Sequence, residues 1–278
     1  MTFRVSLLAV LALLAFAGNS LLCRLALKAT SIDPATFTAI RLVSGAVVLA
    51  LLARAQYGST RVAGDWPSAL ALFTYAAAFS FAYVELDAGA GALLLFGAVQ
   101  LSMLGWGLLH GERLRPLAVA GLLMAFGGLV TLLLPGAQAP GCLPAGLMMI
   151  AGGAWGAYSL RGRHARKPAL IATTGNFIRT LPFVAILALT QMPSLAWDTP
   201  GLLYATLSGA VTSGVGYALW YAALPSLRAM HAASLQLSVP VITLFAGALL
   251  LDEALTLGLL LAAAAVLGGI ALVLLSKR

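Results

Sequence analysis

Long apolar runs, separated by short polar turns, are the main pattern along this chain. Ten runs of about 20 residues can be placed, and this is the length that a helix needs to cross a bilayer. The runs end at prolines or charges, as at Asp33-Pro34 and Asp252-Glu253. The pattern predicts an all-α membrane protein with ten transmembrane spans, at about 5–28, 34–53, 66–84, 88–109, 114–134, 143–161, 170–190, 200–222, 229–250 and 255–275.

The spans also repeat along the chain. Residues 88–134 align without a gap on 229–275, so that Glu112 falls on Glu253 and Gly127-Gly128 on Gly268-Gly269. A weaker match earlier in the chain places Ile40-Arg41 on Ile178-Arg179. The repeat predicts one membrane domain built from two five-helix units, residues 1–139 and 140–278.

Composition excludes a soluble protein. The chain is 62% hydrophobic and 9% charged, whereas a soluble domain has about 25% charged residues. Within lipid the backbone polar groups must be paired inside each span, which favours helices. The net charge of +8 would suggest nucleic acid in a soluble protein, but here the cations lie in short loops. We therefore expect a lipid bilayer and a small-molecule substrate as partners, and no nucleic acid.

The cations gather on one side of the predicted topology. The side of the two termini and the even-numbered connections holds twelve: Arg4, Arg54, Arg61, Arg113, Arg115, Arg161, Arg163, Arg166, Lys167, Arg228, Lys277 and Arg278. The opposite side holds only Arg24 and Lys28. This asymmetry predicts cytoplasmic termini. Because each unit has five spans, the second must be inverted relative to the first, and inverted repeats around a midplane site are typical of secondary transporters.

Several short motifs carry a family resemblance. They are the hairpin turns Gly111-Glu112-Arg113-Leu114 and Asp252-Glu253-Ala254-Leu255, the late Gly127 and Gly268, and Trp155-Gly156. With the ten spans, they resemble the drug/metabolite transporter superfamily in its EamA-type branch, and within it the YddG-type exporters of aromatic amino acids. The first unit has Ala17-Gly18 where the second has Trp155-Gly156. The resemblance implies a bacterial inner-membrane, multi-pass carrier that exports amino acids or similar metabolites by alternating access. A drug or nucleotide-sugar carrier is the alternative.

Aromatic residues are the first candidates for a substrate cavity. Tyr75, Phe79 and Tyr83 recur every four residues and share one helix face. Further candidates from the second unit are Trp155, Tyr158, Ser213, Tyr217 and Trp220. The rings would stack on an aromatic or apolar substrate, and the hydroxyls would bind its polar groups. The alternatives are simple packing or, for Tyr83 and Trp220 near predicted span ends, an interfacial aromatic belt.

Polar residues at depth form the second group of candidates, because such residues are costly in lipid and usually face the bundle interior. They are Asn19, Gln100, Gln236 and Ser238. An amide both donates and accepts hydrogen bonds, which suits the ammonium and carboxylate of an amino acid. The alternative is hydrogen bonding between helices. Pro240 is expected to kink the ninth span near its middle and to assist gating.

Two cations lie inside predicted spans at matching repeat positions, Arg41 and Arg179. Inversion would place Arg41 near Glu253 and Arg179 near Glu112, at opposite membrane faces. We therefore hypothesise two gating ion pairs, Arg41–Glu253 and Arg179–Glu112, that form in alternation. The alternative is that each arginine extends its charged end towards the interface or caps a helix.

All eight carboxylates fall at predicted span ends or loops, so no carboxylate is expected at mid-depth. Proton-driven carriers commonly place one there, and we expect the substrate gradient to drive flux instead. The sequence holds no His-Glu-x-x-His motif and no nucleotide-binding loop. We therefore expect no metal, no cofactor and no enzymatic activity, although a membrane enzyme is the rival class. The oligomeric state is left open, with a monomer compatible.

Overall fold

A computed structural model describes residues 3–58, 63–109, 115–133, 141–163, 167–223, 226–227 and 235–276. Within these ranges the regular secondary structure is entirely helical. The elements are α1 (Phe3–Ala29), α2 (Pro34–Tyr57), α3 (Trp66–Ala82), α4 (Ala88–Leu109), α5 (Pro116–Leu133), α6 (Cys142–Arg163), α7 (Ala169–Thr190), η1 (Met192–Ser194), α8 (Thr199–Leu207), η2 (Ser208–Val215), α9 (Gly216–Ala223), α11 (Ser238–Leu251) and α12 (Leu257–Ser276).

Several of these helices can cross a bilayer. In the part of the chain that the structure describes, five are long and apolar enough: Phe3–Ala29, Pro34–Tyr57, Ala88–Gly107, Ala169–Thr190 and Thr199–Trp220. Shorter apolar helices are Trp66–Ala82, Pro116–Thr131, Ser238–Leu251 and Leu257–Val273. Large apolar side chains such as Leu123, Phe126 and Leu249 point outwards, as lipid contact requires. The all-helical, multi-pass membrane character predicted from the sequence is therefore confirmed.

Aspartate and proline together start three helices. Asp33, Asp65 and Asp198 precede α2, α3 and α8, and each side chain accepts a hydrogen bond from a backbone N–H of the first helical turn. A proline follows each cap in the first two helical positions, where its missing N–H costs nothing. These turns lie where the sequence predicted the ends of spans.

Two helices differ from the predicted spans. The eighth span is interrupted, because α8 and α9 are joined by η2, a π-helix of eight residues. In the ninth span, Leu235 and Gln236 are helical, a turn follows at Leu237, and α11 continues from Ser238. Pro240 lies three residues after this turn, so the helix is interrupted near the predicted position. The assistance of Pro240 to gating stays a prediction.

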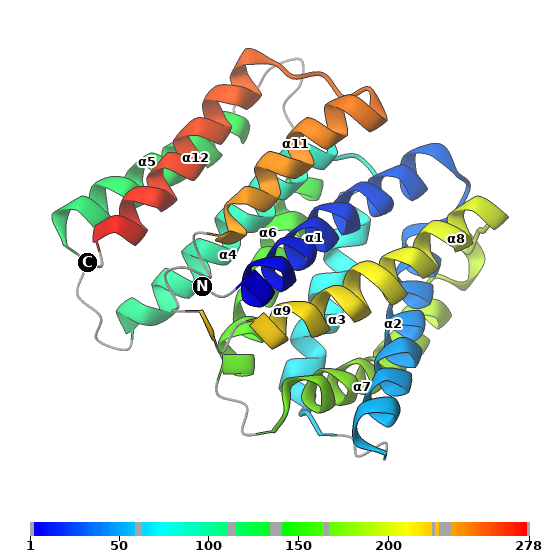
Figure 1. The fold of residues 1–278 in the computed structure, drawn as a ribbon. Helices are drawn as coiled ribbons and strands as arrows, with labels where there is room; N and C mark the ends of the chain where they lie inside the picture. The colour runs from blue at the N-terminus through cyan, green and yellow to red at the C-terminus, as the bar shows by residue number, and fades with distance from the viewer. Residues whose placement is uncertain are drawn as a thin grey trace.

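The helices form one bundle in which the two halves of the chain interleave (Figure 1). From the first half, α1 packs against α8, η2, α9 and α11 of the second half. From the second half, α6 packs against α3 and α4 of the first. The last helices of the two halves, α5 and α12, pair at one edge of the bundle (Figure 1).

Glycines allow the closest helix contacts. A Cβ on Gly209 of η2 would overlap Ser44 Oγ and the Arg41 carbonyl oxygen of α2. In the α5–α12 pair, a Cβ on Gly269 would lie 2.9 Å from Ala125 Cβ, and one on Gly128 would lie 2.9 Å from Ala265 Cβ. Small residues at membrane helix interfaces let backbones approach in this way. The contact between α2 and η2 also brings Arg41 within hydrogen-bond distance of Ser213.

Candidate functional site

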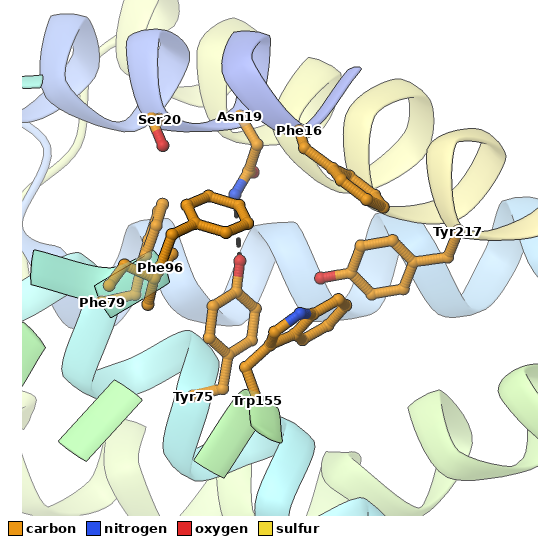
Figure 2. Close-up of a pocket in the computed structure, with 9 residues that line it drawn as sticks. Phe16, Asn19, Ser20, Tyr75, Phe79, Phe96, Trp155 and Tyr217 are labelled. Carbon is orange, nitrogen blue, oxygen red and sulfur yellow. Dashed lines mark hydrogen bonds between the residues drawn. The ribbon is translucent and has the colours of Figure 1, made fainter. Parts of the chain in front are cut away.

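A small cavity lies between the two halves of the chain. It is lined by Phe16, Asn19, Ser20, Tyr75, Phe79, Leu95, Phe96, Trp155 and Tyr217. Figure 2 shows the rings of Phe16, Phe96, Trp155 and Tyr217 around it, with the tyrosine hydroxyls turned inwards. The space open to the centre of a water molecule is about 20 Å³. A volume of that order holds about one water, so a larger ligand requires the walls to move apart.

Asn19 on α1 organises the polar side of the cavity. Its Oδ1 accepts hydrogen bonds from Ser208 Oγ at 2.7 Å and Thr212 Oγ1 at 3.3 Å, both on η2. Its Nδ2 donates to the hydroxyl of Tyr75 at 3.4 Å, as the dashed line in Figure 2 marks. The amide thus joins three helices through both of its ends. The sequence predicted interhelical bonding and cavity lining as alternatives for Asn19, and the structure has both.

Arg41 on α2 lies directly behind Tyr75 and is only 1% exposed. Its Nη2 donates to the Tyr75 hydroxyl at 3.1 Å, and its Nε donates to Ser213 Oγ at 3.1 Å. The guanidinium carbon lies 5.1 Å from the ring centre of Tyr75 and 5.0 Å from that of Phe79, within cation–π range. Its Nη1 makes no hydrogen bond to a described residue.

The hypothesised Arg41–Glu253 pair is not formed in this structure, and Arg24 takes that place. Arg24 Nε lies 3.4 Å from Glu253 Oε1, and its Nη2 lies 3.0 Å from Asp87 Oδ1. Its Nη1 also donates to the carbonyl oxygens of Tyr83 and Val84. The sequence treated Arg24 as a loop cation because it lies near a span end. It is instead buried, with a side chain that is 8% exposed.

Glu253 lies at the centre of this cluster, in the connection between α11 and α12. Both of its oxygens accept the backbone N–H of Ala88, at 2.9 and 2.8 Å, and so cap the start of α4. Burial raises the pKa of Glu253 and nearby Asp87 raises it further, whereas the Ala88 N–H and Arg24 act in the opposite direction. We call Arg24, Asp87, Glu253 and Ala88 the Glu253 cluster. It joins α1 and α4 of the first half to the second half.

A second set of contacts joins the halves at the other end of α3. Arg161 Nη2 of α6 lies 2.8 Å from Asp65 Oδ1, at the start of α3. Arg179 on α7 donates to the Ala63 carbonyl oxygen at 2.7 Å. The 17 residues of α3 separate this end from the Glu253 cluster by about 25 Å. Glu112, the hypothesised partner of Arg179, lies outside the described residues.

Asp65 is held in its charged form at this end. Burial acts to raise the pKa of Asp65, but the Ser68 N–H, Arg161 and the Ser68 hydroxyl together bring it below its ordinary value. The carboxylate and Arg161 are each about half exposed, so their ion pair is screened by water. The pair therefore orients the ends of α3 and α6 more than it stabilises them.

Aromatic rings form a continuous wall beside the cavity. Tyr75 and Phe79 lie 5.4 Å apart between ring centres, and Phe79 and Tyr83 lie 4.6 Å apart, as the predicted helix face requires. Trp155 lies 4.9 Å from both Tyr75 and Tyr217 and so links the two halves. All five are buried.

The predicted site residues fall into three groups. Asn19, Tyr75, Phe79, Trp155 and Tyr217 line the cavity. Tyr83, Tyr158, Trp220 and Ser213 are buried next to it, in the ring wall or on Arg41. Gln100, Gln236, Ser238 and Pro240 are not among the lining residues. The aromatic belt expected as an alternative for Tyr83 and Trp220 was wrong, because both side chains are buried.

Sequence reasoning missed four lining residues, Phe16, Ser20, Leu95 and Phe96. Phe16 was detectable in principle, since it lies three residues before Asn19 on the same helix face. Phe96 lies four residues before Gln100, yet Gln100 does not line the cavity and Phe96 does. Leu95 and Phe96 sit within the apolar run from Ala88 to Val99, where no polar residue distinguishes the lining face from the others.

Comparison with known proteins agrees with this architecture. Residues 143–275 match the EamA-like transporter family. The uncharacterized protein PA1977 of Pseudomonas aeruginosa is 58% identical over 272 residues, which are 98% of this chain and 94% of that protein. The second half of the chain is therefore similar to the EamA-like transporter family, and the whole chain shares a family with PA1977. The match agrees with the EamA-type resemblance that the sequence motifs carry.

A solved crystal structure shares the fold of this EamA-like chain. It covers 100% of this chain and 99% of its own, with a TM-score of 0.69 and 23% sequence identity. At that identity the similarity establishes the fold and gives no information about the substrate. The ring-lined cavity and its polar groups are therefore the basis for assigning a function.

Proposed function

We propose that this EamA-like protein is a secondary transporter of the bacterial inner membrane that exports amino acids, aromatic or neutral, or similar small metabolites. The substrate occupies the cavity around Asn19 and Tyr75, and the two halves move against each other to expose it to either side. Its own gradient drives the flux.

The observation that carries this proposal is a buried cavity lined by both halves and flanked by contacts between the halves at both ends. Tyr75 and Phe16 come from the first half, and Trp155 and Tyr217 from the second. The Glu253 cluster joins the halves at one end, and the Asp65–Arg161 pair joins them at the other. Breaking either set while the other holds would open the cavity to one side only, which is the requirement of alternating access.

The helix contacts support an inverted repeat of two five-helix units. The packing of α3 on α6 has its counterpart in that of α8, η2 and α9 on α1, and the packing of α4 on α6 has its counterpart in that of α11 on α1. The pairs α2–α7, α4–α11 and α5–α12 each join equivalent helices. If each helix is replaced by its equivalent in the other half, the main helix–helix contacts remain the same.

Counterflow in liposomes tests the function. Purified protein is reconstituted without an ion gradient, and uptake of labelled phenylalanine is measured into vesicles that hold unlabelled phenylalanine. We expect saturable exchange that falls about tenfold in Asn19→Ala, because the hydroxyls of Ser208 and Thr212 lose their buried acceptor. Ser194→Ala, which changes an exposed hydroxyl outside the cavity lining, is the control.

Other outcomes separate the parts of this proposal. Exchange of a drug or a nucleotide sugar, with none of any amino acid, would keep the carrier and replace its substrate. No exchange across the whole panel would contradict a gradient-driven carrier. For the topology, reporter fusions at both termini are expected to be active on the cytoplasmic side, as the distribution of cations predicts.

A further inference from the structure

Two buried arginines have opposite electrostatic surroundings. Arg24 has two carboxylates within ion-pair distance, Asp87 and Glu253. Arg41 is more deeply buried, yet none of the ion pairs among the described residues includes it. Its hydrogen-bond partners are the neutral hydroxyls of Tyr75 and Ser213. Burying a charge without a counter-charge is costly, so Arg41 requires an explanation that Arg24 does not.

None of the described carboxylates forms an ion pair with Arg41. Asp33, Asp65 and Asp198 cap helices, and Asp87 and Glu253 pair with Arg24. Glu85 and Asp252 are exposed in connections between helices. Among these residues, no acid lies at the depth of Arg41 to neutralise it.

Arg41 is coupled to the cavity through one hydroxyl. The oxygen of Tyr75 accepts hydrogen bonds from Arg41 Nη2, which lies behind it, and from Asn19 Nδ2, whose side chain lines the cavity. The hydroxyl of Tyr217 is buried and has no hydrogen-bond partner among the described residues, and Figure 2 shows it pointing into the cavity. A ligand that enters there meets a positive field and unused donors.

We propose that this cavity is a carboxylate-binding site in which Arg41 supplies the counter-charge and Tyr217 a neutral donor. The carboxylate replaces the Tyr75 hydroxyl as an acceptor for Arg41 Nη2, or bonds the unpartnered Nη1. The apolar body of the ligand packs among Phe16, Phe96 and Trp155.

The same lining argues against a requirement for an ammonium group. No carboxylate lines the cavity among the described residues, so a ligand cation would face Arg41 without a compensating anion. The substrate class is therefore small carboxylates with an apolar or aromatic body, of which amino acids are one subset and oxo and hydroxy acids another. This inference names the substrate class of the proposed carrier and rests on that function for its physiological meaning.

Calorimetric titration of the purified full-length protein in detergent tests the inference apart from transport. The three probes share a phenyl ring and a two-carbon spacer: 3-phenylpropionate has only the carboxylate, phenylalanine has both charges, and phenethylamine has only the ammonium. We expect the first two to bind and phenethylamine to bind at least tenfold more weakly. Equal affinities, or a preference for the amine, would overturn the proposal on the wild-type protein alone.

Arg41→Gln provides the residue-level test, with Arg54→Gln, an exposed arginine near the end of the same helix, as its control. Arg41→Gln is expected to weaken 3-phenylpropionate binding at least tenfold, and Arg54→Gln to leave it within about twofold, because Arg54 is exposed and does not line the cavity. Arg41→Lys keeps the charge and is expected to retain part of the affinity, which covers the case in which Arg41→Gln does not fold. Equal losses in the two glutamine variants would contradict a direct role for Arg41.

Binding and transport can fail separately in these experiments. Carboxylate binding with no counterflow of any substrate would keep the site and remove the carrier function. Counterflow of substrates that lack a carboxylate, with no binding of 3-phenylpropionate, would keep the carrier and overturn the site.

Discussion

At the scale of single residues, Arg24 and Arg41 show how surroundings decide the energetic role of a side chain. Both are buried arginines on helices of the first half. The charge of Arg24 is balanced by Glu253, whose side chain is 6% exposed, and by Asp87. Arg41 rests on ring faces and hydroxyl oxygens, which favour a cation but do not neutralise it.

This difference predicts opposite effects of removing each charge from the ligand-free protein. Arg24→Met leaves Glu253 buried without its cation and is expected to lower the free energy of unfolding by about 3–5 kcal/mol. Arg41→Met removes an uncompensated charge at similar volume and is expected to leave stability unchanged or to raise it. Thermal unfolding in detergent measures both. A large loss in Arg41→Met would show that Arg41 has a counter-charge that the described residues do not provide.

At the scale of elements, the α5–α12 pair depends on which glycine of each Gly-Gly meets the partner helix. A Cβ on Gly269 would lie 2.5 Å from the Ala125 backbone nitrogen, whereas one on Gly127 would meet no atom of a described residue within 4 Å. Gly269→Ala is expected to lower the free energy of unfolding by about 1–3 kcal/mol through overpacking. Gly127→Ala is the matched control and is expected to be neutral or stabilising, since alanine favours helix. Equal effects on thermal unfolding would argue against close packing at Gly269.

The start of α3 gives a prediction with a pH dependence. Asp65→Asn keeps an N-cap acceptor and loses the half-exposed pair with Arg161, so we expect a loss below about 1 kcal/mol. Asp65→Ala also loses the N-cap hydrogen bond, so we expect its free energy of unfolding to fall by about 1 kcal/mol more.

The pKa of Asp65 is lowered in the folded protein, so its ionised form favours folding. This contribution is fully present above the unfolded value near 3.9 and is lost as pH falls through the lower folded value. The stability gap between wild type and Asp65→Asn should therefore close only below about pH 3.9, as thermal unfolding across pH would show. A gap that closed nearer neutral pH would contradict the assignment.

The elements also show what a sequence can and cannot predict here. Apolar runs bounded by Asp33-Pro34 or Asp198 must become helices, because lipid leaves the backbone no other partner. The spacing of Tyr75 and Phe79 likewise fixes their shared face. The π-helix η2 was not predictable, since a shift of hydrogen bonds by one residue leaves no mark in composition.

The identity of the arginine that pairs with Glu253 was the other feature that the sequence did not predict. The hypothesised Arg41–Glu253 pair combined opposite charges that the predicted topology placed near the same membrane face. The rotation of each helix, which decides whether Arg24 or Arg41 faces Glu253, is set by packing such as that of Gly209 on α2. Polar and aromatic residues at mid-depth therefore predicted part of the cavity lining, namely Asn19, Tyr75 and Trp155. They did not predict which charged residues form ion pairs.

At the scale of the whole molecule, two native thiols can test the proposed opening of the cavity. Cys23 is 0% exposed and directly precedes Arg24, whereas Cys142 is exposed, and both are free. We expect N-ethylmaleimide to label Cys142 rapidly and Cys23 slowly in the wild type.

Glu253→Gln weakens the Glu253 cluster, so Cys23 labelling should accelerate, about tenfold for each 1.4 kcal/mol by which opening becomes easier. Arg161→Gln alters the other end and should not accelerate it. Mass spectrometry of the labelled protein gives both rates, with Cys142 as the internal reference. Equal acceleration in the two variants would mean that Cys23 responds to general loosening of the bundle rather than to opening at one end.

The lack of a described carboxylate beside Arg41 also bears on the electrical work of a transport cycle. Arg41 stays in the protein, so a carboxylate anion that binds it and leaves on the far side carries one net negative charge across the bilayer. An interior-negative membrane potential favours that outward movement by about 2.3 kcal/mol per 100 mV. If the proposed site carries anions, the membrane potential would add to the substrate's own gradient in driving their export, without a coupled proton or sodium ion. Export of zwitterions through the same site would depend on the substrate gradient alone.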